Sequence, residues 1–243
     1  MMTGIYRFAE KLIEVSSLYE RVHGYCAEYR ADGKPDFSVT ITREDIDYER
    51  ERNARAAKLV GRRSYNSPDD YLEELAVYRK IAEQMPYYDT LLFHGSCVAV
   101  DRQGYLFTAK SGTGKSTHTR LWRELWGDKA VMVNDDKPLI TVTADGVLIH
   151  GTPYNGKHRL GSNISVPLKA VCVLERAKTN TIRSISKAEA YPMLIQQAYR
   201  PIDGAALAAT LPLIDKMADA VALYKLGCNM DPQAARVAYE GMK

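Results

Sequence analysis

One short segment restricts the fold of this chain more than any other part of its 243 residues. Residues 109–116 read AKSGTGKS, after an apolar stretch at 105–108 and before an amphipathic stretch at 118–126. Gly112 and Gly114 allow a tight turn in which successive backbone N–H groups converge, and the N-terminus of a following helix adds its positive dipole. A strand, this turn and a helix form a P-loop, so the segment predicts a cradle for phosphate.

The side chains of the turn suit the triphosphate of a nucleotide such as ATP. Lys115 would neutralise the charge of the β- and γ-phosphates, and the hydroxyl of Ser116 or Thr117 would reach Mg²⁺. The motif begins with Ala109 where the usual pattern has glycine, which requires Ala109 to keep a negative φ. The predicted nucleotide-binding residues are Ser111, Gly112, Thr113, Gly114, Lys115, Ser116 and Thr117.

Two adjacent acids, Asp135 and Asp136, end a short apolar stretch at 130–133, about twenty residues after Lys115. In P-loop proteins a strand in this place lies beside the strand that leads into the loop, and an acid at its end reaches Mg²⁺. One carboxylate could support the metal while the other accepts a proton from an attacking hydroxyl. Spacing alone does not assign the two roles, because adjacent strand residues point to opposite faces. An ordinary turn is the alternative interpretation.

Two other places carry candidate functional residues. His94 lies in an apolar strand expected at 91–100, where a histidine could equally be a hydrogen-bonded core residue. The long loop 151–163 contains Lys157, His158 and Arg159, which could clamp a phosphate or an acceptor. A solvated surface loop is the alternative there.

Hydrophobic patterning divides the chain into three parts. We expect a small β-rich N-terminal domain at 1–66, a linking helix within 67–90, and an α/β domain at 91–243. Within the first part, strands are expected at 5–8, 13–15, 22–26 and 37–42. The charged run at 43–63 predicts either a solvated helix or loop face, or a docking surface for an acidic partner or phosphate.

Composition excludes several classes of protein. A net charge of +3 does not favour nucleic acid or an anionic membrane as a partner. The four cysteines, at 26, 97, 172 and 228, lack zinc-ligand spacing. The sequence has neither an apolar run long enough to cross a membrane nor a signal peptide, so we expect a soluble, cytoplasmic protein.

Taken together, the His94-Gly95 pair, the SGTGKS loop and the acids Asp135 and Asp136 resemble the catalytic domain of HPr kinase/phosphorylase and its relatives. That domain shares its P-loop core with ATP-dependent phosphoenolpyruvate carboxykinase. The resemblance covers about 91–243 and is most specific over 94–136. It implies an α/β P-loop kinase domain, with a mixed β-sheet and flanking helices, that is a phosphotransferase and an oligomer.

The resemblance also implies roles for individual residues. His94 would lie near the transferred phosphate, and the pair of acids would supply one catalytic aspartate and one linked to the metal. We expect Asp135 to orient or deprotonate the acceptor hydroxyl and Asp136 to support Mg²⁺. Arg159 loosely matches the arginine of an Arg-Gly-Leu-Gly loop in the family. The chain departs from the strict family at Thr117, where those proteins have glutamate. Its N-terminal segment also differs from the HPr kinase N-terminal domain.

The chain therefore looks more like the divergent HPr kinase-related proteins of bacteria, some of which are associated with phosphorylation of serine in ribosomally made peptides. We expect an ATP-dependent kinase that uses Mg²⁺ and acts on a hydroxyl of a protein, a peptide or a small molecule. Two alternatives stay open: a non-catalytic nucleotide-binding module that regulates a partner, and a simple NTPase with water as the acceptor.

Overall fold

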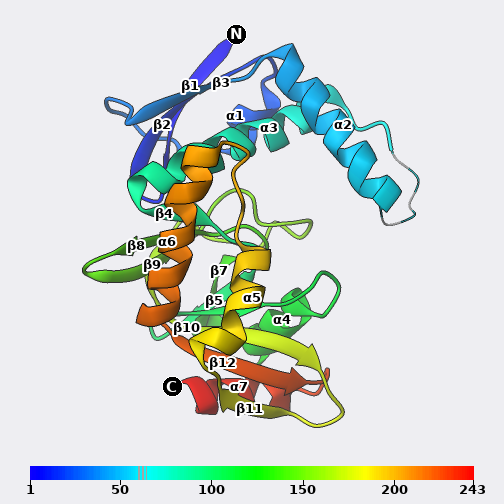
Figure 1. The fold of residues 1–243 in the computed structure, drawn as a ribbon, viewed down its shortest axis with the longest axis vertical. Coiled ribbons are helices and arrows are strands. Elements are labelled where there is room, and N and C mark those ends of the chain that lie inside the picture. The colour runs from blue at the N-terminus through cyan, green and yellow to red at the C-terminus, as the bar shows by residue number, and fades with distance from the viewer. Residues whose placement is uncertain (60, 62, 64) are drawn as a thin grey trace. The chain divides into compact units, whose positions relative to one another are not determined.

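The chain forms two compact units, Met1–Gln84 and Met85–Lys243, in a computed structural model that describes residues 1–59, 61, 63 and 65–243 (Figure 1). The helix expected to link two domains within 67–90 is α3, Asp69–Gln84. It belongs to the first unit, because its buried face packs there against α1, α2 and β3.

The first unit is a small sheet covered by helices. Strands β1 (Met2–Phe8) and β2 (Lys11–Ser17) are antiparallel, and β3 (Phe37–Thr40) pairs in parallel with β2. The strand predicted at 22–26 is wrong: Arg21–Tyr25 is helix α1, followed by a 3-10 turn at Ala27–Tyr29. Val22 and Cys26 are both buried, and residues four apart share one side of a helix. So short a segment has too little periodicity for the sequence to distinguish a helix from a strand.

The charged run of the first unit forms helix α2, Arg43–Leu59. Its basic side chains are largely paired inside the unit. Arg43 and Arg50 both form ion pairs with Asp69 at the start of α3. From α3, Arg79 donates to the buried Glu49 carboxylate of α2 at 2.6 Å. These pairs favour the interpretation of a paired, solvated helix face; Arg62, part of the same run, lies outside the described residues.

The second unit is built on one nine-stranded mixed sheet, which confirms the predicted α/β class. The strand order is β4-β8-β9-β10-β6-β5-β7, and β12 pairs with β10 and β11. The long strand β10 is parallel to β6 and β12 and antiparallel to β9. The strands are β4 (Thr90–Leu92), β5 (Ser96–Val100), β6 (Gln103–Thr108), β7 (Ala130–Asn134), β8 (Leu139–Thr143), β9 (Gly146–His150), β10 (Ser165–Arg176), β11 (Thr181–Ser184) and β12 (Ala222–Cys228).

The single strand predicted at 91–100 is wrong, because the chain changes partners in its middle. β4 pairs with β8, whereas β5 pairs with β6 and β7. Between them, the backbone N–H of His94 donates to the carbonyl of Gln197, and that of Gly95 donates to the carbonyl of Asp136. His94 therefore lies in a break between two strands and not within a strand.

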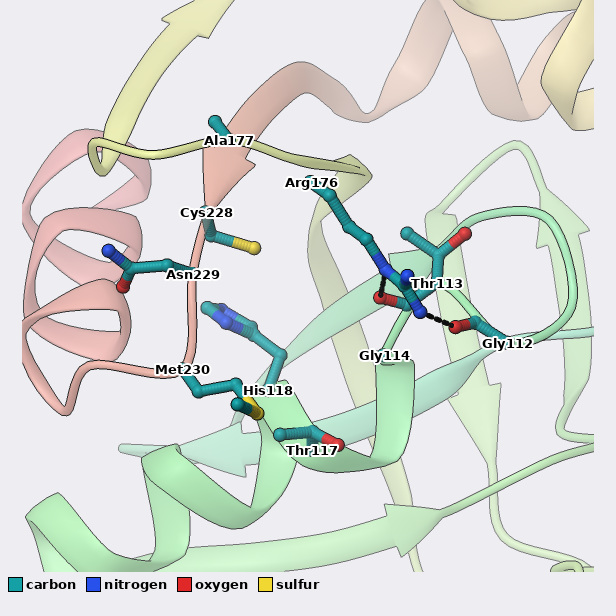
Figure 2. A pocket seen from close by; sticks show the side chains of 10 residues that line it. All are labelled: Gly112, Thr113, Gly114, Thr117, His118, Arg176, Ala177, Cys228, Asn229 and Met230. Atoms are coloured by element: carbon teal, nitrogen blue, oxygen red, sulfur yellow. Dashed lines mark hydrogen bonds between the residues drawn. The ribbon is translucent and has the colours of Figure 1, made fainter.

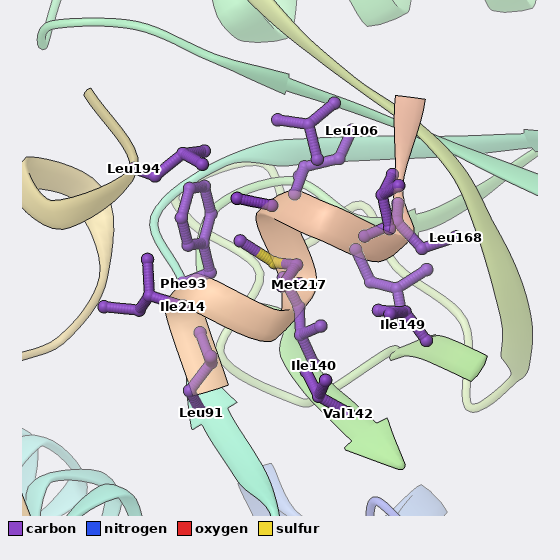
Figure 3. Packing of buried hydrophobic residues seen from close by; sticks show 14 of the residues in the cluster. Leu91, Phe93, Leu106, Ile140, Val142, Ile149, Leu168, Leu194, Ile214 and Met217 are labelled. Atoms are coloured by element: carbon purple, nitrogen blue, oxygen red, sulfur yellow. The ribbon is translucent and has the colours of Figure 1, made fainter. Parts of the chain in front are cut away.

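Helices cover both faces of the sheet. They are α4 (Lys115–Trp126), α5 (Lys187–Gln197), α6 (Gly204–Ala220) and α7 (Gln233–Met242), with 3-10 turns at Met85–Tyr88 and Gly127–Lys129. Alternate strand residues enter two cores: Phe107 packs with α4 and α7, whereas Leu106 packs with α5 and α6. Figure 3 shows Leu194, Ile214 and Met217 of α5 and α6 in the second of these cores. Among the described helices, none has the length and apolar character to cross a membrane.

Candidate active site

Four parallel strands of the second unit end at the same edge of the sheet. β10 is parallel to β6 and β12, and β7 runs with β6 because both are antiparallel to β5. Their last residues are Thr108, Asn134, Arg176 and Cys228. Open α/β sheets bind ligands at the carboxyl ends of parallel strands. The topology thus brings the glycine-rich loop after β6 and the acidic pair after β7 to one edge.

The glycine-rich loop has the backbone that its sequence requires. Gly112 and Gly114 have φ of +77° and +125°, which other residues rarely adopt, and α4 begins directly afterwards at Lys115. Ala109 is buried and has no positive φ, so the departure from glycine there causes no strain. Lys115 Nζ donates to the Ala109 carbonyl at 3.1 Å. Burial lowers the pKa of Lys115, and the charges of Asp136 and Asp135 oppose that shift.

Asp135 is buried and is held by a chain of hydroxyl groups. Ser96, the first residue of β5, donates from Oγ to Asp135 Oδ1 at 2.6 Å. Ser96 Oγ is also 2.9 Å from Thr119 Oγ1 of α4. Because the single hydroxyl proton of Ser96 is used on Asp135, a proton in that second contact has to come from Thr119, whose hydroxyl also lies 3.4 and 3.3 Å from the carbonyl oxygens of Lys115 and Ser116. One carboxylate oxygen of Asp135 is thus fixed by β5 and α4 together.

Asp136 lies between the side chains of His94 and Lys137. His94 Nε2 is 3.4 Å from Asp136 Oδ1, and Lys137 Nζ is 2.9 Å from Asp136 Oδ2. Burial alone would raise the pKa of Asp136, but the contacts with His94 and Lys137 outweigh it and lower that pKa to about 2. Asp136 is accordingly ionised throughout the physiological range. The break between β4 and β5 is what places His94 beside it.

The turn that carries both acids is fixed by Asn134. Its Oδ1 accepts from the backbone N–H groups of Asp136 and Lys137, both at 2.8 Å. Its Nδ2 donates to the carbonyl oxygen and the hydroxyl of Thr152, at 3.1 and 3.0 Å. A fully buried amide with its donors and acceptor engaged in this way defines one backbone path. Asn134 thereby orients Asp135 and Asp136 and ties them to the loop 151–163.

The loop 151–163 passes close to the acids at Gly156. This residue has φ of +72°, and a Cβ there would lie 3.2 Å from the Asp135 carbonyl oxygen and 3.3 Å from Asp136 Cβ. Glycine thus permits the close approach. Lys157 and His158, which follow, reach the cleft described below, whereas Arg159 is exposed and is not among the residues that line that cleft.

These elements enclose a cleft of about 550 Å³, which we call the P-loop cleft. It contains most of the residues that sequence analysis singled out; Thr113, like Arg159, is not part of its lining. The lining residues are His94, Ser111, Gly112, Gly114, Lys115, Ser116, Thr117, Asp135, Asp136, Gly156, Lys157 and His158. A cleft with a lysine, hydroxyl groups and two carboxylates around a helix N-terminus has the chemistry for a polyphosphate and a divalent cation.

A set of three or more His, Cys, Asp or Glu side chains suited to a metal is absent from the described part of the chain. Mg²⁺ is usually bound through only one or two protein oxygens together with substrate phosphates and water. Ser116 and Asp136, both in the P-loop cleft, fit such a donor set.

Sequence reasoning missed three residues that shape the site. Ser96 and Asn134 stand next to predicted residues, and their polar side chains at strand ends were a usable signal. Arg176 could not be identified from such a local signal. It lies at the end of β10, where its Nη2 donates to the Gly112 carbonyl at 2.6 Å and its Nε to the Thr113 carbonyl at 3.4 Å (Figure 2). Only the pairing of β10 with β6 brings it to the loop.

The fold and the cleft define an α/β protein in which a glycine-rich, helix-capping turn faces a pair of acids. The chain belongs to the family described as SynChlorMet cassette protein ScmC, whose model matches residues 71–209, more than half of its length. Every residue that lines the P-loop cleft lies within that match. No curated protein sequence matches the chain.

One solved structure that it is distantly similar to is the Hpr(Ser) kinase/phosphatase from Coxiella burnetii. The similarity covers 39% of this chain and 70% of that chain, with 15% sequence identity and a TM-score of 0.26. A likeness at that level carries no argument about activity, which has to come from the residues of the cleft.

Proposed function

We propose that this protein is an ATP-dependent kinase that transfers the γ-phosphate to a hydroxyl acceptor, with serine of a protein or peptide as the acceptor class. The observation that carries the proposal is the joint presence of Lys115, Ser116, Asp135, Asp136 and His94 in one cleft. Their motifs resemble those of HPr kinase-related proteins, and the serine acceptor rests on that resemblance. A structural turn would not need a lysine, two carboxylates and a histidine around the same space.

The P-loop would hold the triphosphate of ATP. Ser111, Gly112 and Gly114 of the turn line the cleft together with Lys115, the first residue of α4, so backbone N–H groups at this helix N-terminus would bind phosphate oxygens. The Lys115 ammonium group donates a hydrogen bond to the Ala109 carbonyl, and the carboxylates of Asp135 and Asp136 attract it. It would turn to the β- and γ-phosphates when they enter.

Ser116 and Asp136 would hold Mg²⁺, which would neutralise charge on the β- and γ-phosphates. Asp136 suits this role better than that of a base, since it already pairs with the cationic side chain of Lys137. Its contact with His94 holds the imidazole ring beside this carboxylate in the P-loop cleft. His94, together with Lys157 or His158 of the neighbouring loop, would contact the transferred phosphoryl group.

Asp135 would accept the proton of the attacking hydroxyl. Within the described residues, Ser96 is its one side-chain hydrogen-bond donor, and that bond uses Oδ1. A carboxylate whose oxygen is fixed in this way, in a cleft open to an acceptor, can orient a hydroxyl and take its proton. The transfer needs no covalent intermediate on the protein, so positioning and charge supply most of the catalysis.

The test is phosphate transfer from γ-labelled ATP with Mg²⁺ to serine-containing peptides and proteins. Asp135→Asn should abolish transfer while ATP still binds, and Lys115→Met should weaken ATP binding. Asp145→Asn, an equivalent change at an exposed hairpin residue, is the matched control and should behave as the wild-type protein. Full transfer by Asp135→Asn would contradict the role of this residue.

The same assay separates the two alternatives. ATP binding with neither transfer nor hydrolysis would identify a nucleotide-binding module without catalysis. Steady hydrolysis that no acceptor changes would identify an NTPase.

A further inference from the structure

A second cleft, of about 480 Å³, opens beside the P-loop, and we call it the side cleft. Gly112, Gly114 and Thr117 line both clefts, so a ligand bound at the loop can extend from one into the other. The far wall of the side cleft is the end of β12 and the residues after it, Cys228, Asn229 and Met230, together with Ala177 after β10 (Figure 2). Its size is within the roughly 300–1,000 Å³ of small-molecule sites.

The lining of the side cleft differs from that of the P-loop cleft. Its surface is mainly apolar, and none of the residues that line it is an acid. The Asn229 side chain is occupied locally: Nδ2 donates to the Lys178 carbonyl at 2.9 Å, and Oδ1 accepts from the Asp231 N–H at 2.9 Å. Arg176 is likewise bound to the carbonyls of the P-loop. With a mainly apolar lining, no carboxylate, and Asn229 and Arg176 already engaged, this cleft suits a part of the substrate that does not react.

One polar group of the side cleft has no partner. His118, on the first turns of α4, is 2% exposed, and its Nδ1 has no hydrogen-bond partner among the described residues. Its other nitrogen, Nε2, lies 3.1 Å from Trp122 Nε1. Because indole nitrogen is only ever a donor, Nε2 must be the acceptor, and the ring proton must be on Nδ1. A buried N–H group without an acceptor is uncommon and costly, and Figure 2 shows this ring lying among Cys228, Asn229 and Met230.

We propose that the side cleft binds the nucleoside of the phosphoryl donor, with His118 Nδ1–H donating to a base or ribose acceptor. Apolar walls would cover a flat heterocycle, and the lining shared at Gly112, Gly114 and Thr117 would let the attached phosphates reach Lys115. The donor of this protein is then a nucleoside triphosphate and not an inorganic polyphosphate, which would leave the apolar cleft and the His118 donor unused. This inference rests on the proposed kinase function and assigns the place where the nucleoside of its donor binds.

The test compares the binding of ATP and of tripolyphosphate, each with Mg²⁺, by isothermal titration calorimetry on the full chain. ATP should bind at least about tenfold more tightly, because only ATP can fill the apolar cleft. His118→Gln can keep an acceptor for Trp122 while it removes the Nδ1–H. It should weaken ATP about three- to tenfold and leave tripolyphosphate unchanged.

A second variant makes the result independent of any folding defect in His118→Gln. Met230 is 77% exposed, so Met230→Ala should fold normally and still weaken ATP selectively. Ile202→Ala, at a residue 64% exposed and outside both clefts, is the matched control. Equal affinities for ATP and tripolyphosphate, or equal losses for both in the variants, would overturn the nucleoside assignment and leave the phosphate site intact. Failure of both ligands to bind would overturn the proposed function itself.

Discussion

Ser96 and Asp135 are joined by a hydrogen bond of 2.6 Å from the serine hydroxyl to the carboxylate. Ser96 is the first residue of β5, and Asp135 follows the last residue of β7. Because β5 and β7 are antiparallel neighbours, the start of one lies beside the end of the other. The bond can form only where those two ends meet. It makes the position of the candidate base depend on the pairing of the strands as well as on its own turn.

We predict that Ser96→Ala lowers both stability and phosphate transfer. The change removes a donor from a buried carboxylate, which should cost about 1–3 kcal/mol of unfolding free energy. With Asp135 less well oriented, kcat should fall about tenfold, equivalent to about 1.4 kcal/mol, with little change in KM for ATP. Urea denaturation and the transfer assay measure the two effects. Thr119→Val, one step further along the hydroxyl chain, should have the smaller effect on kcat, and the reverse order would contradict this role for Ser96.

A second prediction concerns Asn134→Asp. The carboxylate could still accept from the N–H groups of Asp136 and Lys137, but an oxygen would replace the amide nitrogen that donates to Thr152. Two oxygens would then face each other in a fully buried site, at a cost of about 2–4 kcal/mol in stability. The same change at Asn53, a half-buried residue of α2, should stay within about 0.5 kcal/mol, as measured by thermal or urea unfolding. Equal effects at the two positions would show that Asn134 does not hold the turn.

A third prediction separates backbone strain from crowding of the acids. Gly156→Ala and Gly127→Ala both place alanine at a positive φ, +72° and +53°, and each should lose about 1–3 kcal/mol from backbone strain. The new Cβ at Gly127 meets open space, whereas that at Gly156 presses on the Asp135 and Asp136 backbone and side chain. Only Gly156→Ala should therefore lower phosphate transfer, by about tenfold or more. Normal transfer by a folded Gly156→Ala protein would show that the loop does not position the acids.

Local sequence determines the parts of the site that are contiguous in the chain. The loop 109–116 carries its own glycines and is followed by an amphipathic helix, so its place between β6 and α4 could be predicted. Asp135 and Asp136 could be predicted because a short apolar strand precedes them. The break at His94 could not, since it arises where the chain leaves β8 for β6 and β7 as partners. An apolar run of ten residues looks the same whether or not it changes partners.

The side cleft depends on strand order, which sequence patterns do not specify. Arg176 is the last residue of the long strand β10, and Cys228 is the last residue of β12, which pairs with β10. His118 could be predicted only as part of an amphipathic helix, because its meaning depends on the Trp122 donor on one side and the side cleft on the other. The helix at 21–25 was missed for another reason: five residues hold too little periodicity to outweigh β-favouring side chains.

The last prediction concerns pH and rests on two buried histidines. Burial lowers the pKa of His118 and of His150 from an ordinary 6.5 to about 4. His150 lies between two hydroxyl groups, with Nε2 2.9 Å from Thr141 Oγ1 and Nδ1 2.7 Å from Ser165 Oγ. Between pH 6.5 and pH 4 the unfolded chain therefore binds a proton at each histidine that the folded chain does not. Unfolding free energy rises with pH wherever the unfolded state holds more protons, so stability is fully present above pH 6.5 and falls as the pH drops towards 4.

Over this window each histidine should cost roughly 1.4 kcal/mol per pH unit of acidification. Urea denaturation at several values between pH 6.5 and pH 5 stays above the range where most carboxylates titrate and measures the slope directly. His150→Gln, which can keep hydrogen bonds to Thr141 and Ser165, should remove one of the two contributions and reduce the slope by about 1.4 kcal/mol per pH unit. An unchanged slope in that variant would mean that His150 takes up its proton in the folded protein as readily as in the unfolded chain.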